Sequence, residues 1–179
     1  MDMGAVRPGE RVVIIGGGVI GLLAVQLACL AGGEVLLLTR SEGKQTLGEK
    51  LGASHVAGTA EDALAIWPEG ADLVVECAGV EATVEMCPTL TRSGGRIVVL
   101  GVLPNGTKVS IEPFDLLFRE IQMHFGFLNP FTQERATQMI AKGSISVAPL
   151  ISRTLNLESA GEAISEPARP GEVRAIVVP

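Results

Sequence analysis

The amino-acid sequence predicts an α/β fold in which helices cover both faces of a parallel sheet, a doubly wound architecture. Short runs of consecutive aliphatic residues, such as Val12–Ile15, are typical of strands that are buried on both faces. Longer segments of high helix propensity, such as Val19–Leu30, alternate with these runs. Glycine or proline stands at most of the transitions. This alternation indicates a parallel sheet with crossover helices.

The expected strands and helices follow one another through the first hundred residues. The strands are Val12–Ile15, Val35–Leu38, Ser54–Ala57, Ala71–Glu76 and Arg96–Leu100, and the helices are Val19–Leu30, Glu42–Leu51, Glu61–Trp67 and Val80–Leu90. The first helix should stop at Gly32 and Gly33, and the second at Gly52, because glycine favours helix ends. Pro88 predicts a kink or a boundary in the fourth helix.

The last third of the chain has a less regular pattern. Extended segments are expected at Val109–Ile111, Ile121–Phe127, Leu150–Leu155 and Val173–Val178, and helices at Gln133–Lys142 and Leu157–Ile164.

The composition of the chain limits the classes of protein to which it can belong. The chain has 179 residues, of which 47% are hydrophobic and 19% charged, enough for a single domain with a large aliphatic core. A formal net charge of −6 gives no general attraction to phosphate backbones, so nucleic acid is not an expected partner. No apolar stretch reaches the ~20 residues of a membrane span, and the N-terminus does not follow a signal-peptide pattern. We therefore expect a cytoplasmic protein with no membrane partner.

The cysteines and histidines do not form a metal-binding pattern. Cys29, Cys77 and Cys87 show no CxxC spacing and are expected to be buried, reduced thiols. His55 and His124 have no acidic partner at ligand spacing and are expected to be structural. The sequence predicts no metal site.

A glycine motif carries the strongest functional signal. Gly16, Gly18 and Gly21 match GxGxxG, which a tight turn with close helix–strand packing could also use. Here the motif follows an expected strand, opens a long helix and lies in a strand–helix–strand unit, as a dinucleotide-binding Rossmann fold requires. The unpaired N–H groups at that helix N-terminus would bind the phosphates.

The end of the second expected strand indicates which dinucleotide binds. A carboxylate there would accept hydrogen bonds from the ribose hydroxyls and repel a 2′-phosphate. The sequence has Thr39, Arg40 and Ser41 instead, with Lys44 one helical turn further on. A guanidinium makes paired, charge-assisted bonds to phosphate, so the pattern favours NADP(H) over NAD(H). Two alternatives stay open: Arg40 is a solvated cation, or Glu42 pairs with it or repels the phosphate.

Four longer stretches resemble one family of oxidoreductases. They are "GGGVIGLLAVQLACLAG", "DLVVECAGVEATVE", "RSGGRIVVLGV" and "GFLNPFTQERATQMIAKGSISVAPLISRTLNLESAGEAI". In these the chain resembles the cofactor-binding domain of zinc-dependent medium-chain dehydrogenases/reductases, in the alcohol, polyol and threonine dehydrogenase branch. The resemblance implies that residues 1–179 form one NAD(P)-binding Rossmann domain with six central strands in the order 3-2-1-4-5-6.

The resemblance also implies contacts along the whole coenzyme. These are Val19 and Ile20 beside the pyrophosphate, Cys77 and Ala78 near the ribose, Leu100, Gly101 and Val102 bordering the nicotinamide, and Phe127, Leu128 and Asn129 flanking its carboxamide side. Simple core packing is the alternative for Cys77, Val102 and Phe127.

Two departures from the family pattern matter. Arg40 stands where NAD-dependent relatives usually have an acid, and Gln45 where many have an arginine. Family members also carry a preceding domain with the catalytic zinc ligands, which this sequence does not supply. We therefore expect an excised domain that binds NADP(H), contains no catalytic residue or zinc ligand, and shows little or no turnover alone.

Other interpretations of the same glycine turn remain open. The chain could be a non-catalytic module that senses or binds NADP(H), or part of a zinc-free quinone or enoyl reductase of the same superfamily. Relatives commonly pair through a sheet edge, which here would be Lys108–Ile111 or Ile121–Phe127, so a homo-oligomer is expected. The C-terminal strand Val173–Val178 would return toward the missing domain and leave an apolar face uncovered.

Overall fold

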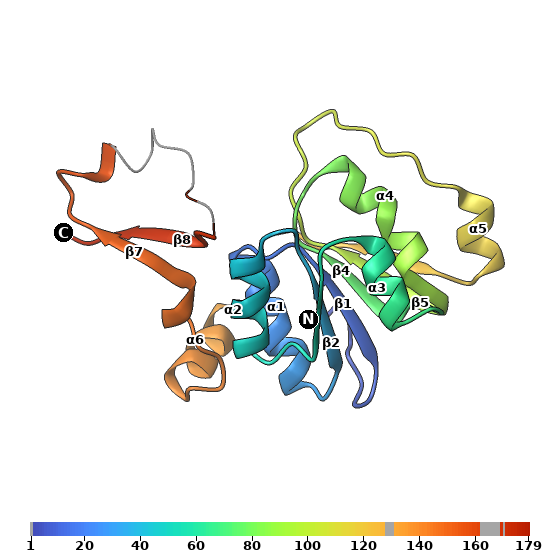
Figure 1. The fold of residues 1–179 in the computed structure, drawn as a ribbon, viewed down its shortest axis with the longest axis horizontal. Helices are drawn as coiled ribbons and strands as arrows, with labels where there is room; N and C mark the ends of the chain where they lie inside the picture. Colours follow the sequence, from blue (N-terminus) through green and yellow to red (C-terminus); the bar gives the residue numbers. More distant parts are fainter. Residues whose placement is uncertain (1, 128–130, 162–168, 170) are drawn as a thin grey trace.

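Six parallel strands form the central sheet of the computed structural model, which describes residues 2–127, 131–161, 169 and 171–179. The strands are β1 (Arg11–Ile15), β2 (Glu34–Leu38), β3 (His55–Ala57), β4 (Ala71–Glu76), β5 (Thr91–Val99) and β6 (Gln122–Phe125). Their order, β3-β2-β1-β4-β5-β6, confirms the predicted one (Figure 1). The order reverses between β1 and β4, so the fold has a topological switch point there.

Helices cover both faces of this sheet, which confirms the doubly wound architecture. They are α1 (Val19–Leu30), α2 (Glu42–Lys50), α3 (Ala60–Ile66) and α4 (Glu81–Leu90). Val12 and Ile14 of β1 pack with the α1 and α2 side, whereas Val13 and Ile15 pack with the α3 and α4 side. Since both faces of β1 are buried, the strand is aliphatic at successive positions.

Local signals explain where these helices begin and end. A capping box opens α3: the amide of Asp62 donates to Thr59 Oγ1 at 3.1 Å, and the amide of Thr59 donates to Asp62 Oδ2 at 3.2 Å. The predicted interruption at Pro88 falls in the last turn of α4, which continues two residues further to Leu90. At that position the proline removes only one hydrogen bond of the helix.

The connection between β5 and β6 differs from the prediction. Residues Val109–Ile111 are irregular and not a strand, so this expectation was wrong. The connection contains instead a short helix, α5 (Pro113–Phe118), which the sequence analysis missed. Pro113 stands at its start, where the missing N–H of proline has no helical partner to lose.

The C-terminal part forms a second, smaller unit of structure. Helix α6 (Gln133–Ala141) and a 3-10 turn (Ala148–Leu150) lead to β7 (Ile151–Leu155), which pairs in parallel with β8 (Arg174–Val177). This two-stranded sheet is separate from the central one (Figure 1). Of the helix expected at Leu157–Ile164, Ala160 and Gly161 are helical, whereas Leu157–Ser159 form a bend and a turn; residues 162–164 lie outside the described residues.

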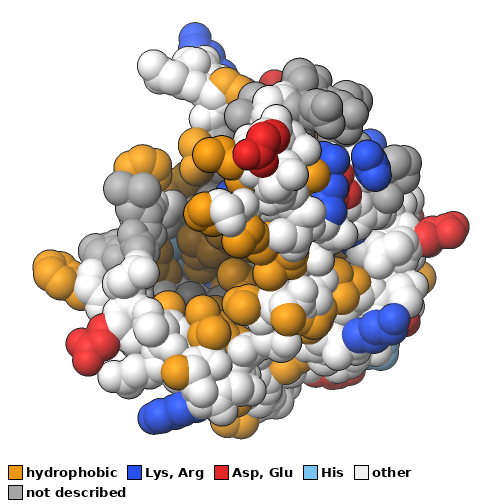
Figure 2. Space-filling model, turned by 90° about the vertical axis from the view of Figure 1, so that its left-hand side faces the viewer, with side chains coloured by type: hydrophobic (Ala, Val, Ile, Leu, Met, Phe, Trp, Pro, Cys, Tyr) orange, Lys and Arg blue, Asp and Glu red, His pale blue; other side chains and the backbone are white. Residues whose placement is uncertain are grey.

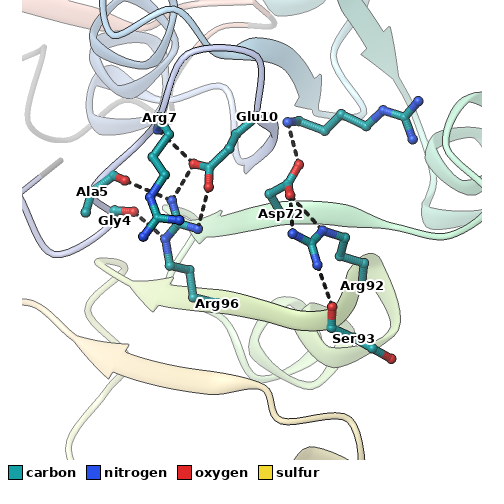
Figure 3. Close-up of polar contacts among 9 residues, drawn as sticks. Gly4, Ala5, Arg7, Glu10, Asp72, Arg92, Ser93 and Arg96 are labelled. Carbon is teal, nitrogen blue, oxygen red and sulfur yellow. Dashed lines mark hydrogen bonds and ion pairs between the residues drawn. The ribbon is translucent and has the colours of Figure 1, made fainter.

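Polar clusters lie at the amino ends of the strands. Arg96 of β5 donates to both carboxylate oxygens of Glu10, at 3.0 and 2.5 Å, and to the carbonyl oxygens of Gly4 and Ala5 (Figure 3). Arg92 binds Asp72 in the same region. These pairs fix the segment that precedes β1. The candidate site lies at the other edge of the sheet, at the carboxyl ends of the strands.

Candidate functional site

The glycine turn joins β1 to α1 at the carboxyl edge of the sheet. Gly16 has φ of +105°, a conformation that L side chains rarely adopt, and its amide donates to the carbonyl oxygen of Leu38 at 2.9 Å. A Cβ on Gly21 would lie 1.8 Å from the carbonyl oxygen of Gly16. The packing of the chain itself therefore requires glycine at positions 16 and 21.

Gly18 has a different explanation. Its φ of −82° is open to any residue, and a Cβ built on it would meet nothing within 4 Å. Neither backbone conformation nor internal packing requires glycine there. The open space above Gly18 is instead what a ligand that approaches the backbone closely would need.

The N-terminus of α1 is prepared for an anion. Gly18 caps this helix without any side-chain hydrogen bond, and no acidic residue lies in the first turn. The amides of Val19, Ile20 and Gly21 begin a helix of 12 residues, so they have no hydrogen-bond acceptor within the helix. Such a helix end binds phosphate groups through its N–H groups and its partial positive charge.

The end of β2 lies beside the glycine turn. A Cβ on Gly17 would be 2.9 Å from Lys44 Cβ and 3.0 Å from Thr39 Oγ1, so these three residues are close neighbours. Gln45 donates to the carbonyl oxygen of Thr39 at 2.7 Å and fixes this bend. The structure thus brings the predicted selectivity residues next to the predicted phosphate loop.

Arg40 faces a shallow basic pocket of about 660 Å³. The charged and hydroxyl side chains that line it belong to Arg40, Ser41, Glu42, Lys44, Arg169 and Glu172. No hydrogen bond or ion pair joins the Arg40 guanidinium to any described residue. The backbone amide of Arg169 and the guanidinium of Arg153 hold the pKa of Glu172 below its ordinary value, so this acid is already engaged. The sequence analysis did not identify Arg169, because it is distant in the chain.

The loops after β4 and β5 form the other half of the edge. The amide of Cys77 donates to the carbonyl oxygen of Ile15 at 2.8 Å, which places Cys77 and Ala78 directly beside Gly16. Burial and the charge of Glu76 raise the pKa of Cys77 to about 12, so this thiol stays protonated. Of the three cysteines, all unpaired, only Cys87 is fully buried, and this corrects the expectation for Cys29 and Cys77.

Several residues predicted for the nicotinamide end lie in the same region. Leu100 and Gly101 follow β5, and their amides donate to the backbone oxygen of Glu76 at 2.8 and 3.1 Å. Val102 and Phe127 are 73% and 72% exposed, so core packing does not explain them. Leu128 and Asn129 lie outside the described residues.

Glu76 is the functional candidate that the sequence analysis missed. It ends β4, is 0% exposed, and accepts hydrogen bonds from the amides of Ala78 and Gly79 and from the Thr83 hydroxyl. The available signal was the carboxylate of Glu76 directly after the aliphatic run Leu73–Val75.

Clusters of metal-ligating side chains and membrane-spanning helices are both absent from the described part of the chain. It contains no group of three or more His, Cys, Asp or Glu side chains that could hold a metal ion. Within the same part, no helix is both long and apolar enough to cross a membrane. A catalytic zinc therefore has no fitting donor set among these residues.

Known proteins of similar sequence and structure point to one family. A family model described as zinc-binding dehydrogenase matches residues 19–142. Sorbitol dehydrogenase of Gallus gallus is 31% identical over 176 residues, which are 92% of this chain and 48% of that protein. D-arabinitol dehydrogenase 1 of Uromyces fabae is 28% identical and aligns with 89% of this chain and 49% of its own length.

A solved structure is also similar to this chain. A candidate zinc-binding dehydrogenase of Sinorhizobium meliloti, bound to NADP, superposes with a TM-score of 0.95 at 46% identity. The match covers 99% of this chain and 55% of the other. The chain thus spans about half the length of the relatives it matches. Since the family model covers well over half of its residues, the chain belongs to the zinc-binding dehydrogenase family.

Proposed function

We propose that residues 1–179 are the NAD(P)-binding domain of a zinc-dependent alcohol or polyol dehydrogenase, an enzyme that transfers hydride between a nicotinamide and an alcohol or carbonyl. The open space at Gly18 is the observation that carries the proposal, because a ligand that approaches the backbone closely explains a glycine there. The amides of Val19 and Ile20 bind the coenzyme pyrophosphate at the start of α1.

The adenosine end of the coenzyme lies in the pocket at the end of β2. Arg40, with Ser41 and Lys44 beside it, binds a 2′-phosphate there, which makes NADP(H) the preferred coenzyme over NAD(H). Two observations support this preference: the Arg40 guanidinium has no partner among the described residues, and the similar Sinorhizobium meliloti protein was solved with NADP. The carbonyl oxygen of Thr39 accepts a hydrogen bond from the side chain of Gln45, and this bond fixes the bend of the chain after β2.

The nicotinamide end lies over the loops that follow β4 and β5. Cys77 and Ala78 contact its ribose, and Leu100, Gly101 and Val102 border the ring. The exposed ring of Phe127 covers the carboxamide side. These contacts are the ones that the family resemblance implies, and they agree with the rule that ligands of such sheets bind at the carboxyl ends of the strands, across the switch point.

The zinc of the family belongs to a part of the enzyme that this chain does not supply. When bound, zinc polarises the substrate oxygen while hydride passes to or from the nicotinamide. This chain holds the coenzyme and supplies one wall of the substrate cleft, and therefore it has no turnover alone. Zinc-dependent alcohol oxidation by the 179-residue chain would contradict this.

An exposed apolar face marks where the remainder of the enzyme packs. Figure 2 shows hydrophobic side chains gathered around a hollow on the side that lies at the left of Figure 1. Ile151, Leu157, Val177 and Val178, around the β7–β8 sheet, are all exposed. A zinc-bearing domain that packs on this face would cover them.

A second exposed surface fits a homo-oligomer. Strand β6 is an edge of the central sheet, and Phe114, Leu117 and Phe118 of the adjacent α5 are each more than two-thirds exposed. Pairing of β6 with its copy would continue the sheet and bury these side chains. We place the protein in the cytoplasm, where unpaired cysteines such as these persist.

Direct titration tests the proposed function. The purified chain is titrated with NADPH, NADP⁺, NADH and NAD⁺ by calorimetry, and by the fluorescence of the reduced forms. We expect saturable binding of the phosphorylated pair at lower concentrations than the other pair. Absence of binding by all four compounds would exclude a dinucleotide-binding domain.

A further inference from the structure

Glu76 is a buried carboxylate at the point where the strand order reverses. It is the last residue of β4, which pairs with β1 on one side and β5 on the other. Its side chain is 0% exposed. Ligands of doubly wound sheets bind just outside this point, so Glu76 lies beneath the site without being open to solvent.

One carboxylate oxygen organises the loop after β4. Oε1 of Glu76 accepts hydrogen bonds from the amides of Ala78 and Gly79, at 2.7 and 2.9 Å. The hydroxyl of Thr83, in the first turns of α4, lies 2.7 Å from the same oxygen. The carboxylate therefore ties the ribose-side loop to the helix that follows it.

The other oxygen faces the loop after β5. Oε2 of Glu76 is buried, and none of the described residues donates a hydrogen bond to it. A Cβ on Gly101 would lie 2.3 Å from this oxygen and 2.2 Å from the amide nitrogen of Gly79. The two loops thus meet backbone to backbone, with the Glu76 carboxylate between them.

Hydrogen bonding alone does not require a carboxylate at this position. A glutamine could accept the same two amide bonds through its carbonyl oxygen, and it would avoid the large cost of burying a charge. Burial is the main cause of the raised pKa of Cys77, and the negative charge of Glu76 is the second cause. The negative charge itself is the feature that folding leaves unexplained.

A charge at this place distinguishes the two forms of the coenzyme. The oxidised nicotinamide ring carries a positive charge that the reduced ring lacks, and a buried negative charge is screened less than one at the surface. We propose that Glu76 is a positioning residue that fixes the two loops under the nicotinamide and, through its charge, favours the oxidised over the reduced coenzyme. This inference rests on the proposed function, because it takes the nicotinamide to lie over these loops.

The test measures the ratio of two dissociation constants, that for NADPH divided by that for NADP⁺. In the Glu76→Gln variant we expect this ratio to fall about tenfold, the order expected for loss of one unit charge inside a protein. Glu34→Gln is the matched control, because Glu34 begins β2 at the opposite end of the sheet and its loss removes the same charge. Thr83→Val removes a hydrogen bond to Glu76 without a charge, so it should weaken both forms equally.

Each outcome decides the proposal. A ratio for Glu76→Gln within twofold of the wild-type value would overturn it, as would an equal change in Glu34→Gln. Should Glu76→Gln fail to fold, Glu76→Asp carries the test: the shorter side chain loosens the loop but keeps the charge, so both affinities fall and the ratio stays constant. A shifted ratio in Glu76→Asp would contradict the proposal. If the wild-type chain binds no coenzyme at all, the proposed function is wrong, and this inference, which depends on it, is wrong as well.

Discussion

Gly21 lies so close to the carbonyl oxygen of Gly16 that a Cβ on residue 21 would be 1.8 Å from it. No such contact exists at Gly18, where the corresponding position is open. The same motif thus contains glycines that the fold requires and one that it does not. This difference allows folding and coenzyme binding to be separated by mutation.

Gly18→Val should remove binding and spare the fold. The added side chain occupies space that is empty in the chain itself, so we expect the free energy of unfolding to fall by no more than about 1 kcal/mol, through weaker helix capping. Coenzyme affinity should fall about a hundredfold or more, because hydrogen bonds to charged groups contribute ~1.5–3 kcal/mol each. Gly21→Ala should show the reverse order of effects, with a loss of roughly 3 kcal/mol in stability from the clash. Equal stability losses in the two variants would contradict this explanation.

Arg40→Asp should reverse the preference for the phosphorylated coenzyme. The variant loses a charge-assisted bond to the 2′-phosphate and adds a carboxylate that repels it, while the new carboxylate can accept a bond from a ribose hydroxyl. We expect NADPH affinity to fall about 10- to 100-fold and NADH affinity to stay equal or rise. Lys108→Asp changes the charge by the same amount at an exposed position of the β5–β6 connection and serves as the control. An NADPH preference that survives in Arg40→Asp would show that Arg40 does not select the coenzyme.

Leu117→Asp tests the proposed oligomer. Leu117 is 74% exposed on α5 beside the edge strand β6, so the substitution should not disturb the monomer core. A charge in a buried apolar contact is costly, and we expect the variant to elute as a monomer in size-exclusion chromatography with light scattering. Leu157→Asp, on the other exposed face, is the control. A wild-type chain that is monomeric at high concentration would exclude this interface.

The sequence was sufficient to predict the central sheet, because its signals are local and mutually consistent. Val12–Ile15 has no polar residue, Ala71–Glu76 has polar residues only at its second and last positions, and glycine follows or precedes the helices between them. Val109–Ile111 failed as a strand because a short alternating pattern also occurs in irregular chain that rests partly on the core. Helix α5 was missed because it has only six residues, too few for a helical repeat of apolar residues to stand out in the sequence.

The candidate site was predictable where one loop carries it, and not where distant loops meet. Gly18 and Arg40 belong to the first strand–helix–strand unit, whose spacing fixes their places. Glu76 and Arg169, which the sequence analysis missed, become neighbours of the site only through tertiary contacts. No local pattern encodes such contacts.

The contact between Glu10 and Arg96 makes stability depend on acid pH. The hydrogen bond from the Arg96 guanidinium, with that from the amide of Arg7, holds the pKa of Glu10 below its ordinary value of 4.5 (Figure 3). A group whose pKa is lowered by folding stabilises the fold above its unfolded-state pKa and loses this contribution as the pH falls through its folded-state pKa. The free energy of unfolding should therefore decline once the pH drops below about 4.5.

Glu10→Gln isolates this contribution. We expect the variant to lose about 2 kcal/mol at pH 7, because the Arg96 side chain is left partly buried with a neutral partner, and to show a flatter decline below pH 4.5 than the wild type. Urea unfolding at a series of pH values measures both quantities. Asp2→Asn removes an ion pair with Arg135 in which both side chains are more than half exposed, so it should change stability by less than about 0.5 kcal/mol at any pH. If the wild type and Glu10→Gln declined in parallel below pH 4.5, the acid sensitivity would have to come from other carboxylates, such as Asp72, whose pKa is also lowered.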